Sequence, residues 1–177
     1  MSAEPKPSTE QAGLASVEQI EALADQLSLC ADELHTTIMR SIKAHKGGTI
    51  SDAEQAVARA LLEDEVMLRQ RANGLYADAA TYVVKALGKP QQHVLDLTAA
   101  AAEKIRKIAV IGDAVGLVAG LLALAGAAAT GQAAAIIAAL DKIRRQVIVL
   151  KADLPKPAAP APAPAPAAAP VPPKPAA

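Results

Sequence analysis

The sequence is nearly devoid of aromatic side chains: Phe and Trp are absent, and Tyr76 and Tyr82 are the only tyrosines. Proteins that bind single-stranded nucleic acid stack the bases on aromatic rings. Lys+Arg and Asp+Glu are equal at 18 each, so no overall charge attracts an anionic partner. We therefore expect no nucleic-acid partner. The hydrophobic fraction is nevertheless 52%, carried by Ala, Leu, Val and Ile, which predicts helices packed closely through small side chains.

Cysteine and catalytic motifs are also scarce. Cys30 is the single cysteine, so an internal disulfide is excluded, and its place on an apolar helical stripe predicts a small buried side chain. The histidines at positions 35, 45 and 93 lack metal-ligand spacing. The sequence has no phosphate loop, dinucleotide fingerprint or nucleophile elbow. We expect no enzyme activity, no cofactor and no metal.

The two ends of the chain have compositions unlike its centre. The start, MSAEPKPSTEQAG, lacks the basic and apolar regions of a secretory signal. We predict a disordered arm over 1–15, a helical domain over 16–151 and a disordered Pro/Ala-rich tail over 152–177, which holds ten of the 13 prolines. The tail is interpreted as a polyproline spacer, with docking to a protein partner as the alternative. We expect synthesis in the cytoplasm, then membrane association or leaderless release, or else a soluble cytoplasmic protein.

Capping signals and apolar periodicity predict an all-α, elongated amphipathic bundle of about four helices. Ser16 with Gln19, and Ser51 with Glu54, have the capping-box spacing that starts a helix. We expect the first helix to end at Lys46–Gly48 and the second near Gly88. The acidic run 63–65, with Arg59, Arg69 and Arg71 nearby, is interpreted as a solvated face of the second helix that forms i,i+4 pairs.

The third predicted helix starts at Pro90 and continues without a break signal to Gly126 or to Thr130-Gly131. A fourth begins at about Ala133 and has a heptad seam typical of a coiled coil. These two helices include the apolar, glycine- and alanine-rich segment 108–140, which forms either a central helix or a hairpin.

The apolar segment is long enough to cross a membrane. No formal charge occurs from Ala114 to Leu140, which is 27 residues, and about 20 helical residues span a hydrocarbon core. A shallow hairpin, one span followed by an interfacial helix, and a hairpin buried in a soluble bundle all fit this pattern. If the segment meets lipid, the membrane-facing candidates are Val110, Ile111, Val115, Leu117, Val118, Leu121, Leu122 and Leu124.

Small residues recur on one side of this segment. Gly112, Gly116 and Gly120 are four apart, and a neighbouring ridge contains Ala119, Ala123 and Ala127. Such small-xxx-small ridges let helices approach closely where lipid supplies no hydrophobic drive, so we predict self-association here into a homo-oligomer. Asp113, at the edge of the segment, is either an insertion switch, a residue facing a lumen, or a plain surface acid.

Together these features predict a membrane-associating protein that inserts or docks its apolar segment in a lipid membrane. Long amphipathic helices around one apolar, glycine-rich segment resemble the architecture of α-helical pore-forming toxins. The resemblance implies pore formation or membrane remodelling as the strongest version of the function, and anchoring of an assembly as the weaker one. The alternative from another class is a soluble, oligomeric helical-bundle scaffold or adaptor whose tail is a spacer.

Overall fold

The structure is a computed structural model that describes residues 13–45, 48–84 and 87–152. Helices dominate this described part, which contains no β-strand, so the all-α prediction is confirmed. The tail from residue 153 onward and the arm over residues 1–12 lie outside the described residues. The elements are α1 (Val17–Ala44), α2 (Asp52–Ala77), α3 (Gln91–Lys107), a 3₁₀ turn η1 (Ile111–Asp113), α4 (Ala114–Ala128) and α5 (Ala133–Ala152).

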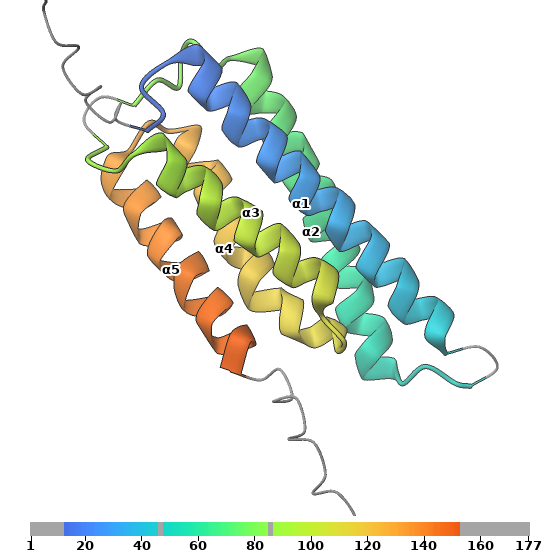
Figure 1. Ribbon diagram of the computed structural model, residues 1–177. Helices are drawn as coiled ribbons and strands as arrows, with labels where there is room; N and C mark the ends of the chain where they lie inside the picture. Colours follow the sequence, from blue (N-terminus) through green and yellow to red (C-terminus); the bar gives the residue numbers. More distant parts are fainter. Residues whose placement is uncertain (1–12, 46–47, 85–86, 153–177) are drawn as a thin grey trace, which may run out of the picture.

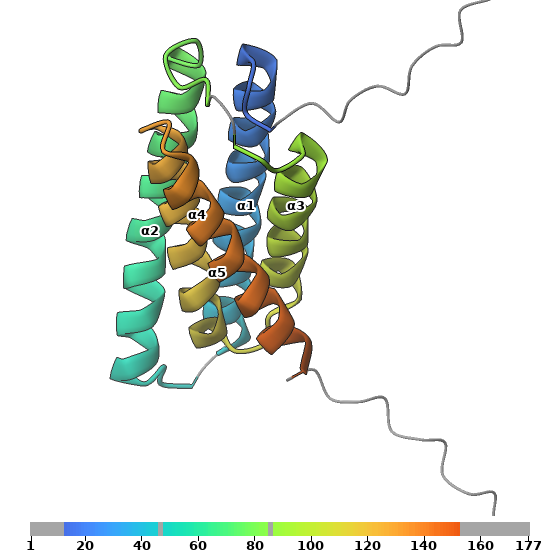
Figure 2. The same cartoon turned by 90° about the vertical axis from the view of Figure 1, so that its left-hand side faces the viewer.

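The helices pack side by side as an elongated bundle (Figure 1). α1 lies between α2 and α3, α4 packs on α2 and α5, and α5 also packs on α3, which closes a ring around the core. α1, α3 and α5 finish at the same end of the bundle, and α2 and α4 begin there (Figures 1 and 2). We call this the hinge end, because the α3–α4 connection, residues 108–113, lies there.

The helix starts at Ser16 and Ser51 follow the predicted capping. The Ser51 hydroxyl accepts from the Glu54 N–H at 3.2 Å, and Glu54 accepts from the Ser51 N–H at 3.2 Å, so the capping box of α2 is complete. Ser16 caps α1 by accepting from the Gln19 N–H at 3.3 Å, while the Gln19 side chain accepts from the Ala15 N–H instead. Both helix starts could be predicted from the sequence because the capping residue and its partner are only three residues apart.

The third predicted helix is wrong in its length, because it breaks after Lys107, and the described part of the chain contains five α-helices rather than about four. Ile108 and Val110 are extended, and η1 then leads into α4. Side chains of α1 satisfy the carbonyls at the break: the Thr37 hydroxyl donates to the Ile105 carbonyl at 3.0 Å, and the Arg40 guanidinium donates to the Arg106 carbonyl at 3.0 Å. The helix therefore ends on groups supplied by another helix.

The second predicted helix also ends early, at Ala77 rather than near Gly88. The chain after it folds over the end of the bundle, where Val84 donates its N–H to the carbonyl of Leu14 at 2.7 Å. Leu14 is fully buried and its N–H donates to the Gln91 side chain at 2.9 Å. Residues 13–15, expected in the disordered arm, are thus part of the packed domain. Gly88 has the expected left-handed conformation, with φ of 67°.

The core consists of small and branched aliphatic side chains, as the composition predicted, and Cys30 is fully buried within it. The interpretation of the acidic run 63–65 as a solvated face is wrong for Glu65, although this residue does form an i,i+4 pair. Glu65, expected on a solvated face, is buried, and its carboxylate pairs with Arg69 of the same helix and lies 3.6 Å from His35 of α1. The pairing stabilises a charge that would otherwise be costly to remove from water.

Candidate functional site: the α4–α5 hairpin and its hinge

Within the described residues, one segment is long and apolar enough to cross a membrane, Ile111–Ala128, which comprises η1 and α4. It has 18 residues, of which 56% are buried. The same length and composition would also suit the central helix of a soluble bundle.

The predicted membrane-facing side chains divide into a buried and an exposed group. Leu117, Val118, Leu121 and Leu124 have no exposed surface, and Ile111 is also buried. Leu122 is half-buried. Val110 and Val115 are 63% and 44% exposed. In this conformation most of the candidates therefore contact neighbouring helices, and the freely accessible ones lie at the hinge end.

The predicted glycine ridge packs against α5 of the same molecule. A Cβ built on Gly116 would come within 2.7 Å of the Gln146 side chain, and one on Gly120 within 2.9 Å of Ile143 Cγ1. A Cβ on Gly112 would meet nothing within 4 Å. On the neighbouring ridge, Ala127 is buried, Ala119 is half-buried and Ala123 is exposed. Gly116 and Gly120 thus serve a close approach between α4 and α5, and that surface is free for a second copy only if α5 moves away.

Polar contacts between helices are concentrated on α1. Toward α2, Arg69 pairs with Asp32 at 2.7 Å, and the Tyr76 hydroxyl donates to Asp25. His45 lies 3.6 Å from Glu54.

Toward α3, besides the two caps from Thr37 and Arg40, the Gln91 side chain donates to the Gln19 carbonyl at 3.0 Å. The Cys30 thiol lies 3.5 Å from the Thr98 carbonyl. Side-chain hydrogen bonds and ion pairs therefore connect α1 to both α2 and α3.

The α4–α5 hairpin, Ala114–Ala152, is attached differently. Among the described residues, no side-chain hydrogen bond or ion pair joins either of its helices to α1, α2 or α3. The hydrogen bonds that its side chains form stay within the hairpin, for example from Thr130 to the Ala127 carbonyl and from Arg145 to the Asp141 carbonyl. Apolar packing and the connection at the hinge therefore hold the hairpin in place.

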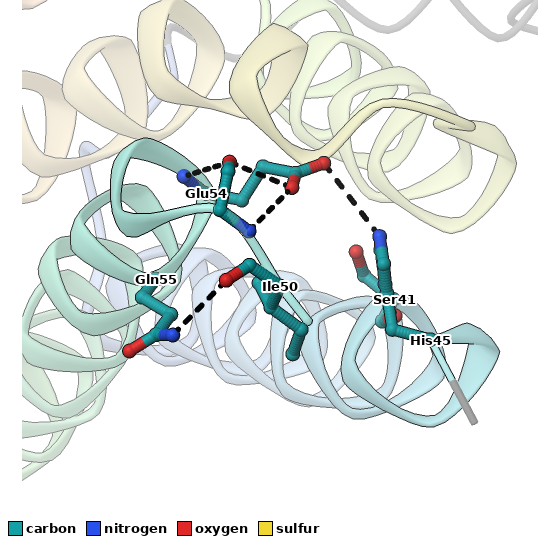
Figure 3. A network of polar contacts seen from close by, with 6 residues as sticks. Ser41, His45, Ile50, Glu54 and Gln55 are labelled. Carbon is teal, nitrogen blue, oxygen red and sulfur yellow. Dashed lines mark hydrogen bonds and ion pairs between the residues drawn. The ribbon is translucent and has the colours of Figure 1, made fainter. Parts of the chain in front are cut away.

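The hinge end has two adjoining surface hollows of about 350 and 240 Å³ beside Ile111, which is itself buried, and both are lined by Ser41, His45 and Glu54. Figure 3 shows this end: Glu54 faces His45, and the Gln55 amide donates to the Ile50 carbonyl at 3.2 Å. The hydrogen bond from the Ser51 hydroxyl lowers the pKa of Glu54 below its usual value, so it is ionised at neutral pH.

Asp113 is exposed at this end and precedes α4 without capping it through its side chain. Its N–H donates to the Val110 carbonyl at 3.0 Å, which closes the 3₁₀ turn. A surface position at the hinge agrees with each of the three roles predicted for it, so these remain predictions.

In the described ranges, no group of three His, Cys, Asp or Glu residues is placed to hold a metal ion. No protein-family model, curated protein or solved structure matches the chain. The function must therefore be argued from the hairpin and its attachment.

Sequence reasoning missed three contributors to this arrangement: Thr37, Arg40 and Leu14. Each acts on a partner more than 60 residues away in the sequence. The only local signal was the run of β-branched residues Ile108, Val110 and Ile111, which lowers helix propensity where α3 ends.

Proposed function

We propose that the protein associates with membranes by moving its α4–α5 hairpin out of the bundle and into lipid. The observation that carries this proposal is that, among the described residues, no side-chain hydrogen bond or ion pair attaches the hairpin to α1–α3; the polar group nearest to it is the Arg71 guanidinium, which lies against Gly126 of α4. Moving the hairpin breaks none of the described side-chain hydrogen bonds or ion pairs, whereas separating α1 from α2 or α3 would break several.

A bilayer lowers the free-energy cost of moving the hairpin out of the bundle. In water, separating the hairpin would expose the apolar side chains of α4, at about 25 cal/mol per Å². Against a bilayer, hydrocarbon chains replace the lost protein neighbours, so this cost largely disappears. The apolar faces that the hairpin leaves on α1–α3 must also be covered, and we expect those helices to lie on the membrane surface.

The two helices of the hairpin suit different depths. The 18 residues from Ile111 to Ala128 extend about 27 Å as a helix, close to the roughly 30 Å of a hydrocarbon core. α5 has exposed basic side chains along one side and suits the interface rather than the interior. Of the predicted topologies, one span followed by an interfacial helix fits these lengths best.

Separation of α5 from α4 would also free the glycine ridge. Gly116 and Gly120 would then be open to the same ridge on another copy, which is the self-association predicted from the sequence. A lined pore would be the strongest form of this function, and an oligomeric anchor the weaker form.

An aspartate placed on the exposed side of α4 tests the proposal. Ala123 is exposed, so Ala123→Asp leaves the closed bundle intact, but an Asp near the centre of a membrane helix costs about 2.5–3.5 kcal/mol. We expect the partition of Ala123→Asp into floated vesicles to fall by about 50-fold or more. Ala60→Asp, an exposed alanine of α2, is the matched control and should partition like the wild type.

Release of an encapsulated dye from the same vesicles separates a pore from an anchor. If the wild-type chain stays in the aqueous phase with every vesicle composition and pH tested, the membrane function is wrong.

The second candidate is a soluble, oligomeric scaffold, and the burial of α4 favours it. Leu117, Val118 and Leu121 have no exposed surface, so the bundle already satisfies its most apolar helix without lipid. This candidate is supported if wild type and Ala123→Asp both remain soluble in the presence of vesicles and sediment as the same oligomer.

A further inference from the structure

Charge is unevenly distributed over a molecule whose formal net charge is zero. The helices α1 and α2 together contain ten acidic and five basic residues. The segment from Glu103 to Lys151 has the opposite balance, with seven basic and three acidic residues. The molecule is therefore acidic along the α1–α2 pair and basic along the end of α3 and along α5.

The basic residues of α5 occupy its outer side. Lys142, Arg144, Arg145 and Lys151 are all exposed. Beside them lie two large aliphatic side chains, Ile148 and Val149, which are 55% and 52% exposed. A soluble helix normally presents polar side chains to water, so this outer side has an unexplained apolar component.

The end of α3 extends the same surface. α5 crosses the bundle and finishes beside the end of α3 (Figure 2), and the two helices are in contact. Arg106 and Lys107 are exposed there, and the hinge residue Val110 follows them. We call the exposed residues Arg106, Lys107, Val110, Lys142, Arg144, Arg145, Ile148, Val149 and Lys151 the basic–aliphatic surface. Two exposed acids adjoin it: Asp141, beside Arg144 and Arg145, and Glu103, which pairs with Lys107.

We infer that the basic–aliphatic surface docks on bilayers that contain anionic lipid, which deepens the proposed function by naming the lipid class. Phosphate and carboxylate headgroups complement the guanidinium and ammonium groups, each of which strengthens binding near a charged membrane by about fivefold. The aliphatic side chains between them enter the region of the headgroups and upper acyl chains, as in helices that lie in the interface. Docking here places the hinge and α5 against the bilayer before α4 leaves the bundle.

The apolar component favours lipid over other polyanions. Ile148, Val149 and Val110 gain nothing from a phosphate backbone in water, and the described part of this surface contains no aromatic ring on which a base could stack. While the bundle is still closed, the acidic outer sides of α1 and α2 are expected to face away from an anionic membrane, so the unequal distribution of charge also orients the docked molecule before the hairpin moves.

The experiment compares wild type with Arg144→Gln/Arg145→Gln in vesicle flotation. The vesicles are pure phosphatidylcholine or phosphatidylcholine with 30% phosphatidylglycerol, at low and at high salt. We expect wild type to prefer the anionic vesicles, the double variant to bind them about 30-fold more weakly, and salt to reduce the difference. Lys43→Gln/Arg59→Gln removes two exposed basic side chains of the α1–α2 pair and should bind like wild type.

The outcomes separate this inference from the proposed function. Equal binding to neutral and anionic vesicles, unaffected by Arg144→Gln/Arg145→Gln, would overturn the anionic-lipid surface and leave membrane association standing. Binding to neither vesicle would overturn both. Binding to a DNA oligonucleotide that depends on Arg144 and Arg145, with no binding to vesicles, would assign the surface to a different polyanion.

Discussion

Thr37 ends α3 from a distance. Its hydroxyl, buried on α1, donates to the Ile105 carbonyl at 3.0 Å, and the same carbonyl accepts a longer bond of 3.3 Å from the Ile108 N–H. We expect Thr37→Val to lower the free energy of unfolding by about 1 kcal/mol, because the buried carbonyl loses the shorter of its two hydrogen bonds. The exposed neighbour Thr36 is the matched control, and Thr36→Val should change the free energy by less than about 0.5 kcal/mol. Urea titration measures both, and equal losses would contradict the cap.

Cys30 behaves as a buried hydrophobic residue. Burial raises the pKa of its thiol from the usual 9.0 to about 12. The unfolded chain therefore loses the thiol proton near pH 9 while the folded chain keeps it, so this thiol's contribution to stability is complete below pH 9 and is lost as the pH rises toward 12. Between pH 8 and pH 10, the stability advantage of wild type over Cys30→Ala should shrink by about 1 kcal/mol.

The comparison with Cys30→Ala cancels the titration of lysines and tyrosines, which both proteins share. An advantage that stays constant over this pH range would mean that the thiol is accessible in the folded state. The same burial implies that Cys30 resists thiol reagents until the protein unfolds.

At the scale of the helices, the close approach of α4 and α5 depends on Gly120. A larger side chain there meets Ile143, whose Cγ1 would lie 2.9 Å from the new Cβ. We expect Gly120→Leu to lower the free energy of unfolding by about 2 kcal/mol or to abolish folding, because the helices would have to separate. Gly112→Ala, where a Cβ meets nothing within 4 Å, should be close to neutral.

Thermal unfolding distinguishes the two variants. If Gly120→Leu and Gly112→Ala melt together, the ridge does not pack as described.

The helices also show what the sequence could reveal. The starts at Ser16 and Ser51 were predicted because each cap lies within three residues of its partner. The break after Lys107 was missed, since its capping side chains come from α1 and nothing within the segment itself forces an end. The burial of Glu65 was missed for the same reason, because His35 of another helix approaches it.

At the scale of the whole molecule, the central ambiguity could not be resolved from composition. A uniformly apolar helix suits both a protein interior and hydrocarbon, and the structure places most of α4 in the former. What the sequence could not show is the difference in attachment: side-chain hydrogen bonds and ion pairs join α1 to α2 and α3, while none of those described joins the hairpin to them. That difference depends on which helix faces pack against each other in the folded molecule, and the sequence pattern of a single helix does not specify its partner.

The proposed insertion of the hairpin requires α4 to move relative to α1–α3, and a polarity-sensitive fluorophore can report this movement. Val115 of α4 and Met67 of α2 are each 44% exposed, so probes on Val115→Cys and Met67→Cys start in comparable surroundings. Cys30, buried and protonated, will not compete for the label.

The most direct measurement is the emission of these two probes with and without anionic vesicles, together with quenching by lipids that carry a quencher in the acyl chain. We expect the probe at position 115 to shift to shorter wavelength and to be quenched from the acyl region, while the probe at 67 remains in water or near the headgroups. Unchanged emission at 115 on vesicles that the protein demonstrably binds would contradict release of the hairpin.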